Sequence, residues 1–321
     1  MSRLAADFIP ADIAIVIPIY NASKTLCSCL DSVLAQSFTA WTALCIDDGS
    51  TDNSASIVAS YARTDSRIKL FSQVNSGVSS ARNLGIRLSS SFCIAFLDSD
   101  DFWHCDHLRL NYSALRKDPR LGISFSRCSF VDVSGHVEAR TSRPIARDLT
   151  LPILMMGNPT TTTSTWVVRA EVFDEVGLFA ESMSFAEDLE LLCRVCATSS
   201  WAIRGNITPL VYYRTSISGL SSHLDCMEEG WLSLISQMRQ YSPSIIQKYF
   251  AKAYSWLLLD LARKAVRLAA GGSSKPVFEY VARALWVYPL ALVVYPRRIV
   301  LVAVMYLVCG LRRRIASFSN S

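Results

Sequence analysis

The sequence has no uninterrupted apolar run of the roughly 20 residues that a membrane-spanning helix requires. Its basic residues do not alternate with aromatics along one stripe, as a nucleic-acid surface would need, and the net charge of +5 is modest for 321 residues. We find no internal repeat and no low-complexity tract. Nucleic-acid binding is therefore disfavoured, and no nucleic-acid partner is expected.

Charge is also scarce, at 18% of residues, whereas hydrophobic residues make up 51% and the mean hydropathy is +0.26. A chain of this length buries a full core and forms one large or two smaller domains. The composition indicates a globular body with more apolar surface than usual. Because the apolar excess lies at the C-terminal end, membrane contact is expected there.

The ten cysteines lack a disulfide pattern and are scattered through apolar segments, which indicates buried thiols in a reducing compartment. Cys193 and Cys196 have the spacing of half a zinc site, but no second pair accompanies them, so core packing is the favoured interpretation. The run from His104 to His107 could be a metal cluster, but it is expected to open a helix instead.

Short β-branched runs alternate with helical spacing of apolar residues through the first hundred residues. The alternation predicts a βαβαβ unit with a mostly parallel sheet, whose ligands bind at the carboxyl ends of the strands. Ser23 is expected to cap the first helix. The expected strands are residues 13–19, 42–46, 68–71 and 91–97. The expected helices are the one that follows Ser23, with apolar positions Leu26, Leu30, Val33 and Leu34, and residues 54–63 and 79–88.

Strands and helices continue to about residue 213, with strands expected at 121–126, 129–133 and 160–168 and helices at 170–176 and 189–197. The threonine bias of residues 160–165 is adequately explained by an extended strand that faces a cleft. After residue 222 the pattern is helical throughout, and the expected helices are residues 233–240, 244–269 and 276–286.

Two apolar segments near the end, residues 285–295 and 299–310, are each too short to span a bilayer. Short apolar helices bracketed by arginines suit a hairpin that lies in the membrane interface, with its cations on acidic headgroups. The alternative is a helical cap with apolar contacts to a partner subunit. The segments are interrupted or followed by Pro289, Pro296, Arg297, Arg298 and the run Arg312, Arg313 and Arg314.

Acidic clusters follow two of the expected strands. Asp98, Asp100 and Asp101 close a buried-looking strand, and such a cluster is costly unless a cation neutralises it. Hard cations such as Mg²⁺ or Mn²⁺ take carboxylate oxygens together with substrate phosphates. The sequence therefore predicts a divalent metal and a phosphate-bearing substrate at the carboxyl edge of the sheet, where the second acidic turn, with Asp47 and Asp48, also lies.

Five motifs stand in register along residues 11–222: Val16-Ile17-Pro18-Ile19-Tyr20-Asn21, Ile46-Asp47-Asp48-Gly49-Ser50-Thr51-Asp52, Asn75-Ser76-Gly77 with Ala81-Arg82-Asn83, Asp98-Ser99-Asp100-Asp101, and Glu187-Asp188. Together they resemble family 2 glycosyltransferases of GT-A fold, of the bacterial cell-surface polysaccharide type. The resemblance implies an α/β fold, with a Rossmann-like nucleotide-binding mixed sheet flanked by helices and a helical C-terminal extension. Its expected parts are a GT-A domain at 11–222, made of a nucleotide-sugar half at 11–105 and an acceptor half at 106–222, and a helical, membrane-associated region at 223–321.

The resemblance implies metal-dependent transfer of a sugar from a nucleoside diphosphate, with inversion, to an acceptor hydroxyl. Asp48 is expected to accept from a base N–H, which favours a UDP-sugar, and Gly49 lets the backbone pass close to the ligand. Arg82 either reaches a phosphate or pairs with Asp48 or Asp98. The other donor-binding candidates are Pro18, Tyr20, Asn21, Asn75, Asp98, Ser99, Arg214, Ser216 and Ser218.

In the same resemblance Asp98 and Asp100 match the DXD pair. Asp100 is expected to bind Mn²⁺ or Mg²⁺ directly, and Asp98 to face the ribose, the metal or its water shell. Asp101 is expected to hold the loop. Asp188 matches the general base that deprotonates the acceptor hydroxyl, and Glu187 orients that site or touches the acceptor. From the residues alone, a carboxylate at this helix start fits capping equally well.

Two departures from the family pattern matter. A histidine often follows a Tyr-Arg pair in related chains, but Thr215 and Ser216 follow Arg214 here, and His223 is a candidate substitute. The Gln-x-x-Arg-Trp motif of processive synthases is absent, which favours addition of single sugars.

The alternatives are a sugar nucleotidyltransferase, whose glycine-rich signature the turn at residues 21–24 does not supply, and a non-catalytic scaffold subunit of a membrane glycan assembly, which is expected to lose its carboxylates. The expected partners are a nucleoside diphosphate sugar, a glycan or lipid-linked acceptor and a membrane surface, with homodimerisation left open. The first 12 residues lack the apolar run of a signal peptide, so the expected location is cytoplasmic, peripheral at the inner face of the cell membrane.

Overall fold

The computed structural model describes residues 11–132, 134–145, 147–183, 185–215, 224–268 and 275–306. They divide into two compact units. The sheet unit contains the described residues of 11–150 and 158–215, and the helical unit contains 151–157 and those of 224–306.

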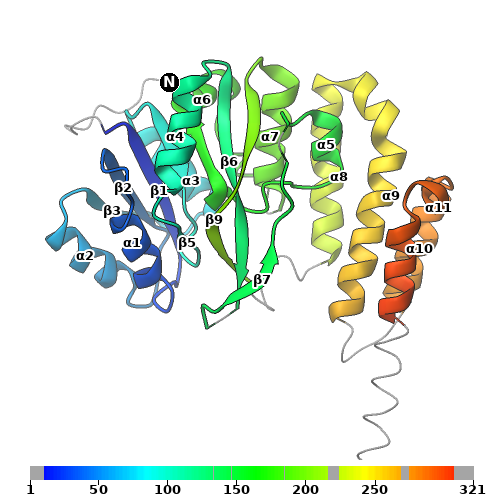
Figure 1. Cartoon of the computed structure of the whole chain (residues 1–321), viewed down its shortest axis with the longest axis horizontal. Helices are drawn as coiled ribbons and strands as arrows, with labels where there is room; N and C mark the ends of the chain where they lie inside the picture. The colour runs from blue at the N-terminus through cyan, green and yellow to red at the C-terminus, as the bar shows by residue number, and fades with distance from the viewer. Residues whose placement is uncertain are drawn as a thin grey trace, which may run out of the picture. The chain divides into compact units, whose positions relative to one another are not determined.

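The sheet unit is built on one mixed sheet with the strand order β3-β2-β1-β4-β8-β6-β9-β5 (Figure 1). Its first half is parallel, as expected from the βαβαβ pattern: β3 (Ile68–Ser72), β2 (Trp41–Asp47), β1 (Ile13–Ile19) and β4 (Cys93–Phe96). The second half is mixed and contains β8 (Trp166–Arg169), β6 (Leu121–Val131), β9 (Ala202–Arg214) and β5 (Phe102–Trp103), with β7 (Val137–Thr141) paired to β6.

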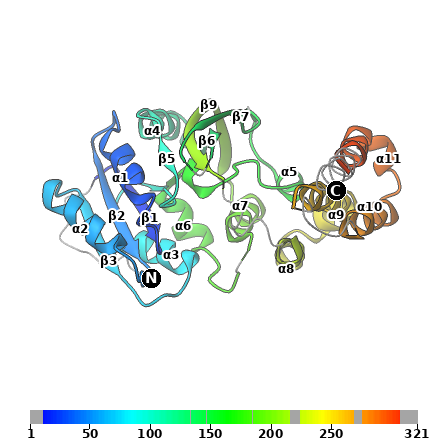
Figure 2. The ribbon, with the colours of Figure 1, turned by 90° about the horizontal axis from the view of Figure 1, so that it is seen from below.

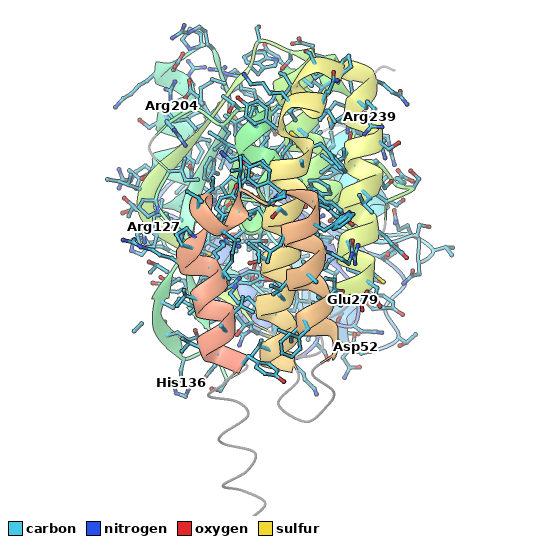
Figure 3. The ribbon with its side chains drawn as sticks, turned by 90° about the vertical axis from the view of Figure 1, so that its right-hand side faces the viewer. Asp52, Arg127, His136, Arg204, Arg239 and Glu279 are labelled. Carbon is cyan, nitrogen blue, oxygen red and sulfur yellow. The ribbon has the colours of Figure 1, made fainter. Side chains whose placement is uncertain are left out.

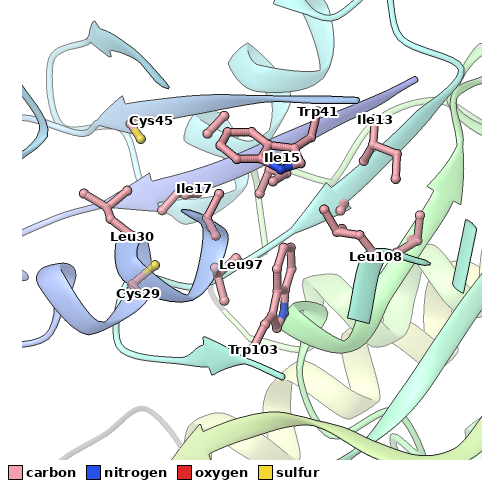
Figure 4. Close-up of a cluster of buried hydrophobic side chains, with 14 of the residues drawn as sticks. Ile13, Ile15, Ile17, Cys29, Leu30, Trp41, Cys45, Leu97, Trp103 and Leu108 are labelled. Carbon is pink, nitrogen blue, oxygen red and sulfur yellow. The ribbon is translucent and has the colours of Figure 1, made fainter. Parts of the chain in front are cut away.

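All seven residues of β1 are buried, because helices cover both faces of a parallel sheet. Figure 4 shows Ile13, Ile15 and Ile17 packed with Leu30 of α1 and Trp41 of β2. Pro18 is tolerated in this central strand because the pairing with β4 ends at Val16, before the missing N–H would be needed. The strand order thus aligns the carboxyl ends of β1, β2 and β4 at one edge.

Helices join and cover these strands: α1 (Leu26–Leu34), α2 (Ser54–Thr64), α3 (Val78–Leu88), α4 (His107–Lys117), α6 (Ala170–Val176) and α7 (Glu187–Thr198). Gly85 lets α3 approach β1 closely, since a Cβ at this position would lie 2.4 Å from Cγ1 of Val16. This close packing fixes the position of Arg82, one turn earlier in α3.

Three local expectations were wrong. Helix α1 begins at Leu26, after Thr25, and the Ser23 backbone N–H instead donates to Asp52, so Ser23 is not the cap. Residues 121–126 and 129–133 are not separate strands, because β6 runs through to Val131 with irregular register against β9. The threonine-rich residues 160–165 are not a strand either: they form a polar loop that ends in a 3₁₀ turn (Thr163–Thr165), and β8 begins only at Trp166.

The helical unit contains α5 (Leu151–Met155), α8 (Leu224–Tyr241), α9 (Pro243–Leu268), α10 (Lys275–Val287) and α11 (Ala291–Val294), followed by helical residues 296–306. The described part of the chain after residue 222 is therefore largely helical, as expected. In Figures 1 and 2, α9 lies beside α8 and α10. Leu258, Ala262 and Ala284 are buried in the apolar core cluster of this unit. Within the described ranges, every helix is too short or too polar to cross a membrane.

Candidate active site

Asp98 lies just beyond β4 and is surrounded by hydrogen-bond donors. Its Oδ1 accepts from Nη2 of Arg82 at 2.8 Å, and its Oδ2 accepts from Oγ1 of Thr162 at 3.1 Å and of Thr163 at 3.3 Å. The backbone N–H of Asp98 donates to Oγ of Ser164 at 3.0 Å. These contacts hold the carboxylate in one orientation at the carboxyl edge of the sheet.

Arg82 joins this strand end to the start of α7. Its side chain is only 5% exposed, and its Nη1 donates to Oε1 of Glu187 at 2.9 Å while its Nη2 binds Asp98. Of the alternatives for Arg82, pairing with Asp98 is present, whereas pairing with Asp48 is not. Both terminal nitrogens of the guanidinium contact a carboxylate, so two acidic motifs far apart in the sequence form one site.

Asp101 is buried and ties the acidic loop to two other segments. Its Oδ2 accepts from Oγ of Ser164 at 2.7 Å and its Oδ1 from the backbone N–H of Arg214 at 3.0 Å. Burial, and then the charges of Asp100 and Asp98, raise the pKa of Asp101 well above its usual range. Asp101 thus holds the loop.

Asp100 lies on the same loop but reaches solvent. Partial loss of hydration and the charge on Asp98 raise the pKa of Asp100 to about 6. Nε of Arg214 donates to the backbone carbonyl of Asp100 at 3.0 Å, which places a cation beside the acidic loop. The site therefore combines an accessible carboxylate with an adjacent arginine.

Asp188 stands in the first turn of α7, next to Glu187, after Ala186, which has a left-handed φ of 60°. Burial, and then the charge on Glu187, raise the pKa of Asp188 to about 7. Its Oδ2 accepts from Nδ2 of Asn158 at 2.5 Å. A carboxyl with a pKa near neutrality is suited to general-base chemistry, which helix capping alone does not require.

The acidic turn after β2 is closed by Asp48, which is 3% exposed. Its Oδ1 accepts from Nε2 of Gln73 at 2.7 Å and the N–H of Ser76 at 2.8 Å, and its Oδ2 accepts from the N–H of Gly77 at 2.9 Å. Asp48 therefore fixes the turn at residues 75–77. Its contact with a nucleobase stays a prediction.

Backbone geometry shapes the rest of this edge. Asn21 has a left-handed φ of 49° and accepts from the N–H of Thr51 at 2.9 Å through Oδ1. Gly49 has φ 75°, and a Cβ there would lie 3.0 Å from the N atom of Asn75, so glycine is required. Asn75 is exposed, as is Tyr20 at 54%, whereas Pro18 is buried within β1.

Hydrogen bonds and ion pairs join Arg82, Asp98 and Glu187 directly, and Asp100 and Arg214 through the backbone of one loop. The backbone carbonyl of Ser99 accepts a hydrogen bond from Oγ1 of Thr25 at 2.9 Å. Ser216, Ser218 and His223 lie outside the described residues.

The Asp100 carboxylate fits a hard divalent cation, because it is exposed and its negative charge lies beside that of Asp98, which a cation would neutralise. Both oxygens of Asp98 already accept hydrogen bonds. A second group, His104 with its two following residues, brings ligand atoms within 4.8 Å of one another, but the Asp106 carboxylate in it already accepts from Ser37 and Arg109. Cys193 is a buried free thiol, as expected from core packing.

Sequence reasoning missed the residues that hold these carboxylates: Asn158, Thr162, Thr163 and Ser164. The compositional bias at 160–165 was a real signal, but a strand facing a cleft was the wrong interpretation of it. The hydroxyls are buried, and buried hydroxyls need polar partners, which the strand-end aspartates supply.

Comparisons with known proteins point to one family. The family model described as "Glycosyl transferase family 2" matches residues 14–177. EpsJ of Bacillus subtilis, an uncharacterised glycosyltransferase, is 32% identical over 189 residues, which cover 55% of this chain and 53% of EpsJ. WfgD of Escherichia coli, a UDP-Glc:alpha-D-GlcNAc-diphosphoundecaprenol beta-1,3-glucosyltransferase, is 38% identical over 107 residues, covering 33% of this chain and 42% of WfgD. The matched segments thus span about half or less of these relatives.

Two solved structures show the same fold. The mannosyltransferase PcManGT of Pyrobaculum calidifontis, in complex with GDP-Man and Mn²⁺, has a TM-score of 0.57 at 18% identity and covers 95% of this chain and 87% of that one. S. aureus TarS 1–349 with UDP-GlcNAc has a TM-score of 0.54 at 17% identity, over 89% of this chain and 92% of that one. With a sheet of GT-A type and a family match over half its length, this chain belongs to glycosyl transferase family 2.

Proposed function

We propose that this protein transfers a single sugar from a nucleoside diphosphate sugar to an acceptor hydroxyl, with inversion at the anomeric carbon. The observation that carries the proposal is the Arg82 bridge, which joins Asp98 at the donor edge to Glu187, beside the base candidate Asp188. A sugar-transfer site needs both groups within one substrate's reach, because the hydroxyl must lose its proton as its oxygen attacks.

Asp188 is the base in this mechanism. With a pKa of about 7, a large fraction of Asp188 is ionised at neutral pH, yet the carboxylate is basic enough to accept the proton of the acceptor hydroxyl. The oxygen attacks the anomeric carbon from the face opposite the diphosphate, which inverts the configuration. Glu187 and Arg82 keep the base beside the donor edge, since their ion pair anchors the first turn of α7.

We propose that Asp100 holds Mn²⁺ or Mg²⁺, with Asp98 as an outer partner. When bound, such an ion neutralises the charge that develops on the diphosphate leaving group. Arg214 is placed beside the same loop and is the protein's own cation for the diphosphate. We propose a UDP-sugar as the donor because of the base contact predicted for Asp48. Two similar proteins support this choice: the name of WfgD includes UDP-Glc, and TarS has been solved in complex with UDP-GlcNAc.

The decisive experiment follows thermal stability of the purified protein with a panel of UDP- and GDP-sugars, with Mn²⁺ and with chelator. A bound donor stabilises the folded state in proportion to the logarithm of its concentration over Kd, so one donor should raise Tm only with metal. Asp100→Ala is expected to abolish the metal-dependent part, whereas Asp132→Ala, at a side chain that is 47% exposed, should retain it as a control. If no donor raises Tm, the enzymatic proposal fails and the scaffold alternative gains support.

We further propose peripheral attachment to an anionic membrane surface, where a lipid-linked surface glycan would be the acceptor. Trp286 is 88% exposed and Val293 77% exposed, and further exposed apolar side chains of the helical unit are Leu290, Leu292, Val300, Leu301 and Val304. Figure 3 views this unit with α10 and α11 in front, and Glu279 is labelled on α10. After Glu279 the sequence contains arginines but no acidic residue, so its charge complements acidic headgroups.

Vesicle sedimentation tests this attachment without any sugar substrate. The protein should bind vesicles that contain phosphatidylglycerol, bind phosphatidylcholine vesicles weakly, and lose most binding in the double variant Trp286→Ser and Val293→Ser. Tyr241→Ser, which alters an exposed aromatic of α8, serves as the control. A concentration-dependent dimer without vesicle binding would instead assign the apolar side chains to a subunit interface.

A further inference from the structure

One short loop donates hydrogen bonds both to the acidic loop after β4 and to the acidic start of α7. Within residues 158–164, Thr162 and Thr163 donate to Asp98, Ser164 donates to Asp101, and Asn158 donates to Asp188. The donor edge and the base candidate are therefore held by the same stretch of backbone.

The orientation of the Asn158 amide is determined by its neighbour. Its Oδ1 accepts from the backbone N–H of Thr160 at 2.9 Å and from Oγ1 of Thr160 at 2.7 Å. An amide turned the other way would place its NH₂ against the Thr160 N–H and its oxygen against the Asp188 carboxylate. The Nδ2 atom must therefore face Asp188, 2.5 Å from its Oδ2.

The loop also keeps a strained backbone. Thr161 has φ 73°, in the left-handed region that β-branched residues rarely adopt. This conformation is unfavourable for a β-branched residue, so the contacts on either side must over-determine it. Asn158 lies before Thr161 and the hydroxyls that bind Asp98 lie after it.

We propose that Asn158 is a positioning residue for Asp188: its side-chain amide holds one carboxylate oxygen so that the carboxylate stays oriented for the acceptor hydroxyl. This inference rests on the proposed role of Asp188 as base. Asn158 touches no reacting atom and acts through Asp188 alone. The remaining loop contacts set the distance from that base to Asp98.

The groups around Asp188 act in different directions, and the backbone N–H of Leu189 already donates to its Oδ1 at 2.6 Å, which favours the ionised form. Glu187 on α7 and Asp98 after β4 disfavour its ionised form, whereas Arg82 on α3 favours it. Asn158 is the neutral side chain that donates to the other oxygen, Oδ2, and its N–H stabilises the ionised form because a carboxylate accepts hydrogen bonds more strongly than a carboxylic acid. Without this donor, Asp188 should take up its proton at higher pH and leave its orientation.

The experiment measures the protonation of Asp188 in the free protein by NMR of ¹³C-carboxyl-labelled aspartate, with the resonance assigned by its loss in Asp188→Asn. Asn158→Asp keeps the oxygen that binds Thr160 but replaces the donor with a negative charge. Asn158→Ala removes both contacts. Asn206→Asp is the matched control, because Asn206 accepts from the Thr208 N–H in the same two-residue geometry at an exposed site.

The midpoint of Asp188 should rise by about one pH unit or more in Asn158→Asp, by a smaller amount in Asn158→Ala, and not at all in Asn206→Asp. Backbone amide spectra check that each variant is folded, and Asn158→Ala decides the matter if the aspartate variant is not. Unshifted midpoints in the folded Asn158 variants would overturn the positioning role. Turnover of Asp188→Asn tests the base assignment separately, so the two failures are distinguishable.

Discussion

The two units bury charge in opposite ways. In the helical unit, Glu228 faces the guanidinium of Arg283 and the hydroxyl of Tyr254, so one acid meets one cation and one neutral donor. In the sheet unit, Arg82 faces two carboxylates, and further acidic side chains lie close by. The carboxyl groups of Asp100, Asp101 and Asp188 in the sheet unit have raised pKa values.

This difference separates buried charges that stabilise the fold from buried charges that are needed for a reaction. A balanced cluster such as that of Glu228 links α8, α9 and α10 and needs nothing from outside the chain. An excess of carboxylates works against folding and is retained where a cation or a proton transfer uses it. Substitutions that alter one cluster at a time can test this distinction.

The largest effect is expected at the base. Asp188→Asn should lower kcat about a thousandfold, because the amide cannot accept the hydroxyl proton. Donor binding, followed by thermal shift with Mn²⁺, should remain near that of the wild type. Turnover within a few fold of the wild type would remove Asp188 as base. It would also make the raised pKa of Asp188 a by-product of its burial.

Arg82→Met comes next. The side chain of Arg82 is 5% exposed, and its loss would leave Asp98 and Glu187 partly buried without their cation. Breaking such a pair is expected to lower the free energy of unfolding by about 3 kcal/mol, measured by urea denaturation. Arg82→Lys should recover only part of it, because one ammonium does not span both carboxylates as the guanidinium fork does. A loss below 1 kcal/mol would contradict the view that Arg82 joins the two acidic motifs.

Sequence alone could place the acidic motifs of the sheet unit together, because parallel strands bring their carboxyl ends to one edge. Asp98 after β4 and Asp48 after β2 follow from that rule. The order of helices and strands in the first hundred residues follows from hydrophobic periodicity. The sequence pattern could not identify the partner of Arg82, because a long side chain on a helix can reach several neighbouring groups.

The polar loop lay beyond sequence reasoning for a physical reason. Whether residues 160–165 extend or turn depends on buried hydroxyls finding Asp98 and Asp101, which are far away in the sequence. Local propensity favours a strand for threonine, and tertiary hydrogen bonds override it. The prediction that Ser23 caps α1 was wrong for the same reason, because the Ser23 N–H donates to Asp52, which is distant in the sequence.

A smaller effect is expected from Glu187→Gln, which removes the like charge beside Asp188. The wild-type rate should rise with pH through about 7, as Asp188 ionises. Without the charge on Glu187 the pKa of Asp188 falls, so this rising limb should move to lower pH by about one unit or less. A rate profile of kcat between pH 5 and 9 measures the shift. A limb that stays in place would mean that burial alone sets the pKa.

The free energy of unfolding should depend on pH in the opposite direction to the rate: it should fall as pH rises. Because folding raises the pKa of Asp188, the folded state favours the protonated acid, and this contribution is present below the ordinary pKa and lost as pH rises through about 7. Glu187→Gln should therefore reduce the loss of unfolding free energy between pH 4 and pH 7. Urea denaturation at both pH values, compared with the wild type, tests the direction.

The smallest effect is expected from Arg283→Met in the helical unit. Arg283 is 39% exposed, so solvent screens its pairing with Glu228, and Tyr254 still donates to that carboxylate after the substitution. The free energy of unfolding should fall by about 1 kcal/mol or less, and turnover should stay at the wild-type level. A loss as large as that of Arg82→Met would show that the balanced cluster carries the same energetic weight as the acidic site. The contrast between the units would then lie in chemistry alone, because the proposed mechanism couples the buried charge of the sheet unit to a proton transfer.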